Sequence, residues 1–199
     1  GGYAVSEIIT GKISPSGKLP ISIESRLEDN PCYGNYYENV SRMRTPEINP
    51  YSRLEYREGI FSGYRGYDKS EVKPLYPFGY GLSYTTFEYS DISVAEDGKE
   101  FVVSFNLKNT GKVAGAEVAQ IYVTDEECSL VRPVKELKGF EKVYLEPGES
   151  KRVSVRLDDE AFRFFNPVAH KWVVEPGEFT VSVGASSADL RLKAQLTVK

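Results

Sequence analysis

The alternation of apolar and polar side chains in the second half of the chain constrains its fold more than any other feature. Val103, Phe105 and Leu107 lie two positions apart and so share one face of an extended segment. The same period recurs in residues 153–157, 179–183 and 190–198. Segments of this kind bury their apolar faces when two antiparallel sheets pack together. Residues predicted to be buried are Val103, Phe105, Val155, Phe179 and Val181; those predicted to be exposed are Lys108, Arg152 and Arg156.

Turn sequences separate these segments at regular intervals. Asn-Thr-Gly-Lys occupies residues 109–112, and Glu-Pro-Gly-Glu occurs at both 146–149 and 175–178. About seven short strands with such turns are typical of an immunoglobulin- or fibronectin type III-like β-sandwich. Cys32 and Cys128 lie far apart and offer no inter-sheet pair, so we expect two free thiols. Trp172 precedes two valines and is predicted to lie in the core, as are Phe162 and Phe164.

Residues 77–89 mark the start of this β-rich region. Pro77, Gly79 and Gly81 are typical of a tight turn, and the aromatic residues among them indicate that the turn is packed. From Tyr84 the sequence changes to alternating aromatic and β-branched residues, which predicts a strand. We therefore divide the chain into residues 1–83 and a sandwich domain over residues 84–199.

Residues 1–23 have the pattern of the end of an α/β domain. Ala4, Val5, Ile8 and Ile9 form one helical stripe, and Gly11 is placed to end that helix. A turn over residues 14–20 and a short strand over 21–23 follow. A helix this short is marginal in water, so we expect it to pack on another element. The chain also begins without Met, which suggests a piece of a larger protein.

Residues 24–67 are less regular. Tyr33, Tyr36 and Tyr37 lie in a long segment without a dominant period, which we interpret as an ordered connection. Residues 60–67 alternate with glycines and are predicted to form a strand. Glu58 and Arg65 could serve a functional site, but a structural ion pair or solvated charges is the favoured interpretation.

Composition excludes several classes of function. The formal net charge of -4 and the pI near 5.3 argue against nucleic acid or an anionic membrane as partner. No apolar run approaches the ~20 residues that a membrane span needs, so we expect a soluble protein of unknown compartment. No phosphate-binding loop or metal-ligand spacing is present, and we expect no cofactor. His170 is interpreted as a surface residue, and Cys128 follows three acidic residues that would make its thiol less reactive.

Several motifs resemble family 3 glycoside hydrolases, which include β-glucosidases and β-xylosidases. The motifs are Ser-Pro-Ser-Gly-Lys-Leu-Pro at 14–20, Glu-Gly-Ile at 58–60 with Gly-Tyr-Arg at 63–65, Pro-Phe-Gly-Tyr-Gly-Leu-Ser at 77–83, Asn-Thr-Gly at 109–111, Leu-Lys-Gly-Phe at 137–140 and Leu-Glu-Pro-Gly-Glu at 145–149. They cover most of the chain in the family's order. The resemblance implies the end of an α/β sandwich domain followed by a fibronectin type III-like domain.

The resemblance also implies a role. Family members hydrolyse O-glycosyl bonds of β-linked glycosides with an Asp on an N-terminal barrel and a Glu in the α/β domain, upstream of the Gly-Lys-Leu-Pro motif. Neither position exists in this chain, so we expect no catalytic, cofactor-binding or metal-binding residue here and no activity of the chain alone. The expected partner is the remainder of a parent enzyme, with its barrel and α/β domains.

An alternative is a free-standing β-sandwich module that binds carbohydrate or protein. Residues 1–83 argue against it, because a free module has no use for an α/β ending. With Trp172 placed in the core, the sandwich also lacks an aromatic platform for sugar. If any residue contacts substrate, we expect it in the Tyr33, Tyr36 and Tyr37 segment.

Overall fold

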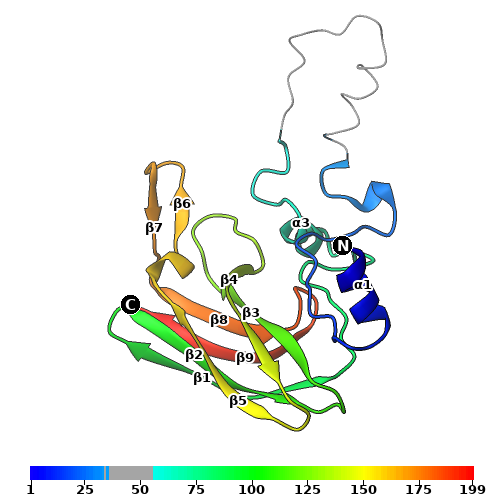
Figure 1. The fold of residues 1–199 in the computed structure, drawn as a ribbon. Coiled ribbons are helices and arrows are strands. Elements are labelled where there is room, and N and C mark those ends of the chain that lie inside the picture. Colours follow the sequence, from blue (N-terminus) through cyan, green and yellow to red (C-terminus); the bar gives the residue numbers. More distant parts are fainter. Residues whose placement is uncertain (34, 36–55) are drawn as a thin grey trace, which may run out of the picture.

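The computed structural model describes residues 1–33, 35 and 56–199. It consists of a β-sandwich with a smaller helical region against one side (Figure 1). Tyr36 and Tyr37 lie outside the described residues, as does most of the connection predicted over residues 24–56.

Seven strands form two antiparallel sheets, as predicted for a sandwich. The first sheet has the order β1-β2-β5, with β1 at Phe87–Asp97, β2 at Glu100–Asn109 and β5 at Ser150–Leu157. The second has the order β4-β3-β8-β9, with β3 at Gly115–Asp125, β4 at Glu136–Leu145, β8 at Gly177–Gly184 and β9 at Leu190–Val198. A short helix η2 (Asp159–Ala161) precedes a hairpin of β6 (Phe164–Asn166) and β7 (Lys171–Val173).

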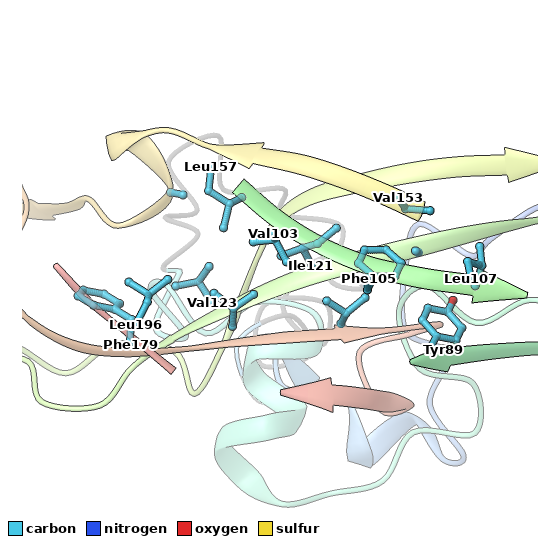
Figure 2. Close-up of a cluster of buried hydrophobic side chains, with 14 of the residues drawn as sticks. Tyr89, Val103, Phe105, Leu107, Ile121, Val123, Val153, Leu157, Phe179 and Leu196 are labelled. Atoms are coloured by element: carbon cyan, nitrogen blue, oxygen red, sulfur yellow. The ribbon is translucent and has the colours of Figure 1, made fainter. Parts of the chain in front are cut away.

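The core lies between the two sheets (Figure 2). Val103 and Phe105 of β2 and Phe179 and Val181 of β8 are fully buried, as the alternation predicts. Phe162 closes one end of the core. Its ring packs edge-on against the rings of Phe101 and Phe179, with a distance of 5.2 Å between ring centroids in each pair. The prediction for Val155 is wrong in degree, because this residue of the edge strand β5 is only half-buried.

The polar face of the first sheet faces solvent. Lys108, Arg152 and Arg156 are exposed, which confirms the prediction. The Arg156 guanidinium lies 2.8 Å from an Asp97 carboxylate oxygen and 3.0 Å from one of Glu100. These exposed pairs contribute little to stability.

The prediction that Trp172 lies in the core is wrong. Its side chain is 65% exposed on β7, in a hairpin that extends away from the sheets (Figure 1). The Phe165 ring on β6 meets it edge-on, with ring centroids 5.8 Å apart. The strands of this hairpin are three residues each, too short for the alternation to reveal them.

The helical region begins with α1 (Gly2–Ile9), as predicted. Gly11 ends it with φ +75°, and its N–H donates to the Ile8 carbonyl. The described residues cover the apolar stripe of α1 only in part: none of its residues is buried, and of the four only Ile8 is half-buried. A short helix η1 (Leu27–Asp29) follows. Residues 21–23 form no strand; Ile23 makes a single antiparallel bridge with Tyr76.

Residues 60–67 do not form the predicted strand. A helix, α3 (Tyr64–Ser70), starts after Gly63, whose φ of +56° ends the extended backbone. Tyr67 and Gly66 face inward in α3, and Gly66 lies so close to Pro31 that a Cβ would be 2.6 Å from its ring. Close approach of another element was therefore predicted correctly, but in the wrong secondary structure.

Neither cysteine forms a disulfide: Cys32 and Cys128 are both free. Within the described residues, no helix combines the length and apolarity needed to cross a membrane.

Candidate interface between the two regions

The turn at residues 77–83 joins the N-terminal segment to the sandwich through backbone hydrogen bonds. The Gly79 N–H donates to the Leu19 carbonyl at 2.8 Å, and the Leu19 N–H donates to the Tyr80 carbonyl at 2.8 Å. On the other side, the Ser187 N–H donates to the Phe78 carbonyl at 2.9 Å. The turn thus lies between the Gly-Lys-Leu-Pro segment and the β8–β9 connection.

Gln120 of β3 fixes this turn from inside the sandwich. Its buried amide nitrogen donates to the carbonyl oxygens of Gly79, at 3.1 Å, and Ala185, at 2.8 Å. The Tyr122 hydroxyl donates to the other end of the amide at 2.6 Å. These three hydrogen bonds fix the orientation of the Gln120 amide. Burial raises the pKa of the Tyr122 hydroxyl.

A buried ion pair crosses between the regions. The Lys18 ammonium lies 3.0 Å from a Glu117 carboxylate oxygen, with side chains 14% and 8% exposed. Lys18 also donates to the Ala185 carbonyl at 3.1 Å, and the Tyr89 hydroxyl donates to Glu117 at 2.9 Å. Burial, with the Glu117 charge adding to it, raises the pKa of Tyr89. Each charge has a partner, as buried charges require.

Sequence reasoning missed this pair. The Gly-Lys-Leu-Pro motif includes Lys18, and Glu117 interrupts the apolar pattern of β3, but 99 residues separate them. A charged residue inside a buried strand was the available signal.

Tyr84 attaches α1 to the same turn. Its hydroxyl donates to the Ile8 carbonyl at 2.9 Å, and its N–H donates to the Ser14 hydroxyl at 3.0 Å. Beside it, an open cavity of 1010 Å³ lies between the end of α1 and β3 and β4. The described residues that line this cavity include Lys12, Lys142 and Tyr144 but no carboxylate. Glycoside hydrolysis by two carboxyl groups has no basis there.

Helix α3 forms a second attachment to the sandwich. Arg65 pairs with Glu136 at 3.0 Å, and Lys135 pairs with Asp68 at 2.6 Å. Arg65 therefore forms an ion pair, one of the two interpretations favoured from the sequence, with Glu136 as its partner. Glu58 takes no part in it; this residue accepts a hydrogen bond from the Asn35 side chain at 2.5 Å.

The tyrosine at the start of α3 strengthens this attachment. The Tyr64 hydroxyl accepts from the Leu137 N–H at 2.9 Å. Its ring stacks on Phe78 with centroids 5.0 Å apart and meets Tyr122 edge-on at 6.0 Å. Turn, helix and sandwich are therefore packed together by aromatic rings.

The remaining groups named from the sequence are His170 and Cys128. His170 is exposed in the β6–β7 turn at φ 50°. Burial raises the pKa of the Cys128 thiol, and the Asp125 charge adds to this effect, as the acidic neighbours predicted. Among the described residues, no group of three His, Cys, Asp or Glu side chains could hold a metal ion.

Comparison with known proteins gives a family match in each of the two regions. Residues 1–84 match the Glycosyl hydrolase family 3 C-terminal domain, and residues 117–187 match the Fibronectin type III-like domain. The β-glucosidase BoGH3A of Bacteroides ovatus is 47% identical over 96% of this chain. The thermostable β-glucosidase B of Acetivibrio thermocellus is 46% identical over 99% of it.

Solved structures agree with these relatives. The β-glucosidase of Kluyveromyces marxianus in complex with glucose has a TM-score of 0.90 and 42% identity, and the match covers 100% of this chain and 23% of that one. The β-glucosidase 3B of Thermotoga neapolitana has a TM-score of 0.86 and 42% identity over 98% of this chain and 26% of its own. The chain spans 25% of the length of the two curated relatives. It belongs to the family 3 glycoside hydrolases and carries their C-terminal domain followed by a fibronectin type III-like domain.

Proposed function

We propose that this chain is the C-terminal, non-catalytic part of a longer enzyme that hydrolyses β-glucosides. Residues 84–199 form a structural domain that stabilises the position of the α/β ending, residues 1–83. The observation that carries this proposal is the buried pair of Lys18 and Glu117, because it joins the family's Gly-Lys-Leu-Pro segment to the sandwich at 3.0 Å. The substrate class comes from the relatives, which are β-glucosidases.

The division at residue 83 is part of the same proposal. It is supported by the family match over residues 1–84 and by the start of β1 at Phe87. The bonds across that division are numerous, and most of the side-chain bonds are at least partly buried, which favours a rigid connection. A rigid connection between domains suits an enzyme, because small displacements of its catalytic groups reduce the rate of the reaction.

The absence of catalytic residues is supported by what the buried carboxylates do. Glu117 is held by Lys18 and Tyr89, and Asp125 is held by Arg132 at 2.6 Å. Glycosidases need two carboxyl groups that face a substrate across about 5–9.5 Å. Carboxylates that are committed to cations inside a domain do not meet that requirement.

The test compares the complete protein containing this chain with a version that lacks residues 84–199. The complete protein should hydrolyse an aryl β-glucoside, and the truncated protein should lose activity together with thermal stability. Lys18→Met in the complete protein should lower the unfolding temperature and shorten the half-life of activity at elevated temperature. A complete protein without glycosidase activity, or a truncated one that is equally stable and active, would contradict the proposal.

A further inference from the structure

The sandwich displays apolar side chains on two neighbouring segments, residues 126–135 between β3 and β4 and residues 164–175 around the β6–β7 hairpin. We call these two segments together the protrusion. Five large apolar side chains on it are 48–85% exposed: Val131, Val134, Phe165, Val168 and Trp172. Exposed apolar residues that gather in this way mark sites of interaction, whereas single ones need no explanation.

One cation–ring contact, made by the buried Arg132 side chain, and two exposed hydrogen bonds join the two segments. The Arg132 guanidinium lies 5.1 Å from the centre of the Phe164 ring and 2.6 Å from Asp125, with the Arg132 side chain 7% exposed. The Ser129 N–H donates to Glu175 at 2.9 Å, and the Ser129 hydroxyl donates to the same carboxylate. The apolar side chains are thus presented on a preformed surface, which reduces the entropy lost on binding.

The protrusion is continuous with the helical region. Glu136 lies 3.1 Å from Arg132 of the protrusion and 3.0 Å from Arg65 of α3. Lys135 bonds Asp68 of the same helix. Figure 1 shows the hairpin, the β3–β4 connection, α3 and α1 on the same side of the two sheets. A body that covers both α1 and the protrusion would therefore lie on this one side of the sheets.

The chemistry of the surface favours a protein over a sugar. Among its five exposed apolar side chains, only Trp172 carries a hydrogen-bonding group, its indole N–H. Sugar hydroxyls would find few partners among three valines and a phenylalanine. Exposed aromatic rings such as those of Phe165 and Trp172 are typical of the centre of a protein–protein interface.

We propose that the protrusion docks on an apolar surface of the same polypeptide, in the part that the relatives have and this chain does not span. About three quarters of each relative lies outside the matched segment. Val5 and Ile9 on the apolar stripe of α1 are 54% and 75% exposed, so this helix also needs cover from another part of the protein. The inference depends on the proposed function, since it requires a longer protein, and it adds a second contact that is separate from the 77–83 turn.

The first measurement is amide hydrogen exchange of residues 164–173 in the complete protein and in the chain of residues 1–199. Docking predicts exchange slower by about tenfold or more in the complete protein, because local opening of the hairpin would then break the interface. Equal exchange rates in the two proteins would overturn the docking. If that complete protein still hydrolyses aryl β-glucosides, the proposed function stands without this inference.

The second measurement uses Trp172→Ser together with Phe165→Ser. This double variant should lower the unfolding temperature of the complete protein and leave that of residues 1–199 nearly unchanged. Phe140→Ser is the matched control, since Phe140 is 64% exposed on β4 outside the protrusion, and it should have the same small effect in both proteins. Equal effects of the double variant in both proteins would show that the aromatic pair only stabilises its own hairpin.

Two alternatives are tested on residues 1–199 directly. Trp172 is the single tryptophan of this sequence, so its fluorescence reports on the protrusion alone. A saturable change with cellopentaose would overturn the proposal in favour of a sugar platform. Dimers in sedimentation that disappear in Trp172→Ser would overturn it in favour of a second copy; an unchanged spectrum and a monomer are the expected results.

Discussion

The amide nitrogen of Gln120 donates to the carbonyl oxygen of Gly79 at 3.1 Å, and this contact leaves no room for a side chain on the glycine. A Cβ on Gly79 would lie 2.1 Å from the Gln120 side-chain oxygen, and the residue has φ +79°. Turn and strand are therefore complementary at the level of single atoms. This explains in physical terms why the turn contains a glycine at this position.

Gly79→Ala should strongly destabilise the chain. The positive φ costs about 1–2 kcal/mol for alanine, and the contact with buried Gln120 adds about 1–3 kcal/mol. Gly148→Ala is the control: its φ is +76°, but nothing lies within 4 Å of its Cβ position, so only the backbone cost applies. Urea unfolding of both variants measures the difference. Equal losses of unfolding free energy in the two variants would show that the Gln120 side chain can move away from the new methyl group at little cost in stability.

Lys18→Met should cost about 3–5 kcal/mol of unfolding free energy, because it leaves Glu117 charged and buried without its cation. Lys12→Met removes a pair with Glu7 in which the lysine side chain is 65% exposed, and should cost under about 1 kcal/mol. Chemical denaturation of the two variants gives the comparison. An equal and small loss of unfolding free energy in both variants would contradict the stabilising role of the Lys18–Glu117 pair.

Phe162→Ala should cost about 3–5 kcal/mol, as expected for a buried aromatic ring that leaves a cavity. Its ring is 1% exposed and contacts Phe101 and Phe179. Phe140→Ala, at 64% exposed, should change stability by no more than about 0.5 kcal/mol. Thermal unfolding compares the two variants. Similar decreases in unfolding temperature would contradict the buried position of Phe162 at the end of the core.

Asp189 should make the stability of the chain depend on acid pH. Its hydrogen bonds to Arg191 hold the pKa of this carboxyl below its usual value of 3.8. A lowered folded pKa means that the contribution is present above the unfolded pKa and lost as pH falls through the folded one. Asp189→Asn should therefore be less stable than the parent chain at pH 7, and this stability difference should shrink as the pH falls through the folded pKa of Asp189. A stability difference that stays constant across that range would contradict this assignment.

Sequence patterns predicted the sandwich well, because burial imposes period two on long strands. Val103 and Phe105 alternate with outward-facing residues over the ten residues of β2, and Phe179 and Val181 do so in β8. The pattern failed where elements are short. The hairpin that carries Trp172 has strands of three residues, so burial and exposure could not be distinguished there.

Contacts between the two regions were largely beyond sequence reasoning. Residues 77–83 were correctly interpreted as a packed turn, because glycine and proline restrict the backbone locally. Gln120 contacts that turn, and Glu117 contacts Lys18. A polar residue inside a buried strand signals that it has a partner, but its local sequence does not say which distant residue that partner is. The strand predicted over residues 60–67 was wrong because Gly63 breaks the extended run and Tyr64 and Tyr67 face inward at helical spacing.

The central claim is that this chain supports a glycosidase and performs no hydrolysis itself. The most direct test is to assay purified residues 1–199 on an aryl β-glucoside and an aryl β-xyloside. The account predicts no turnover above that of buffer. Turnover that survives repurification and is abolished by changing one acidic residue within these 199 would contradict it.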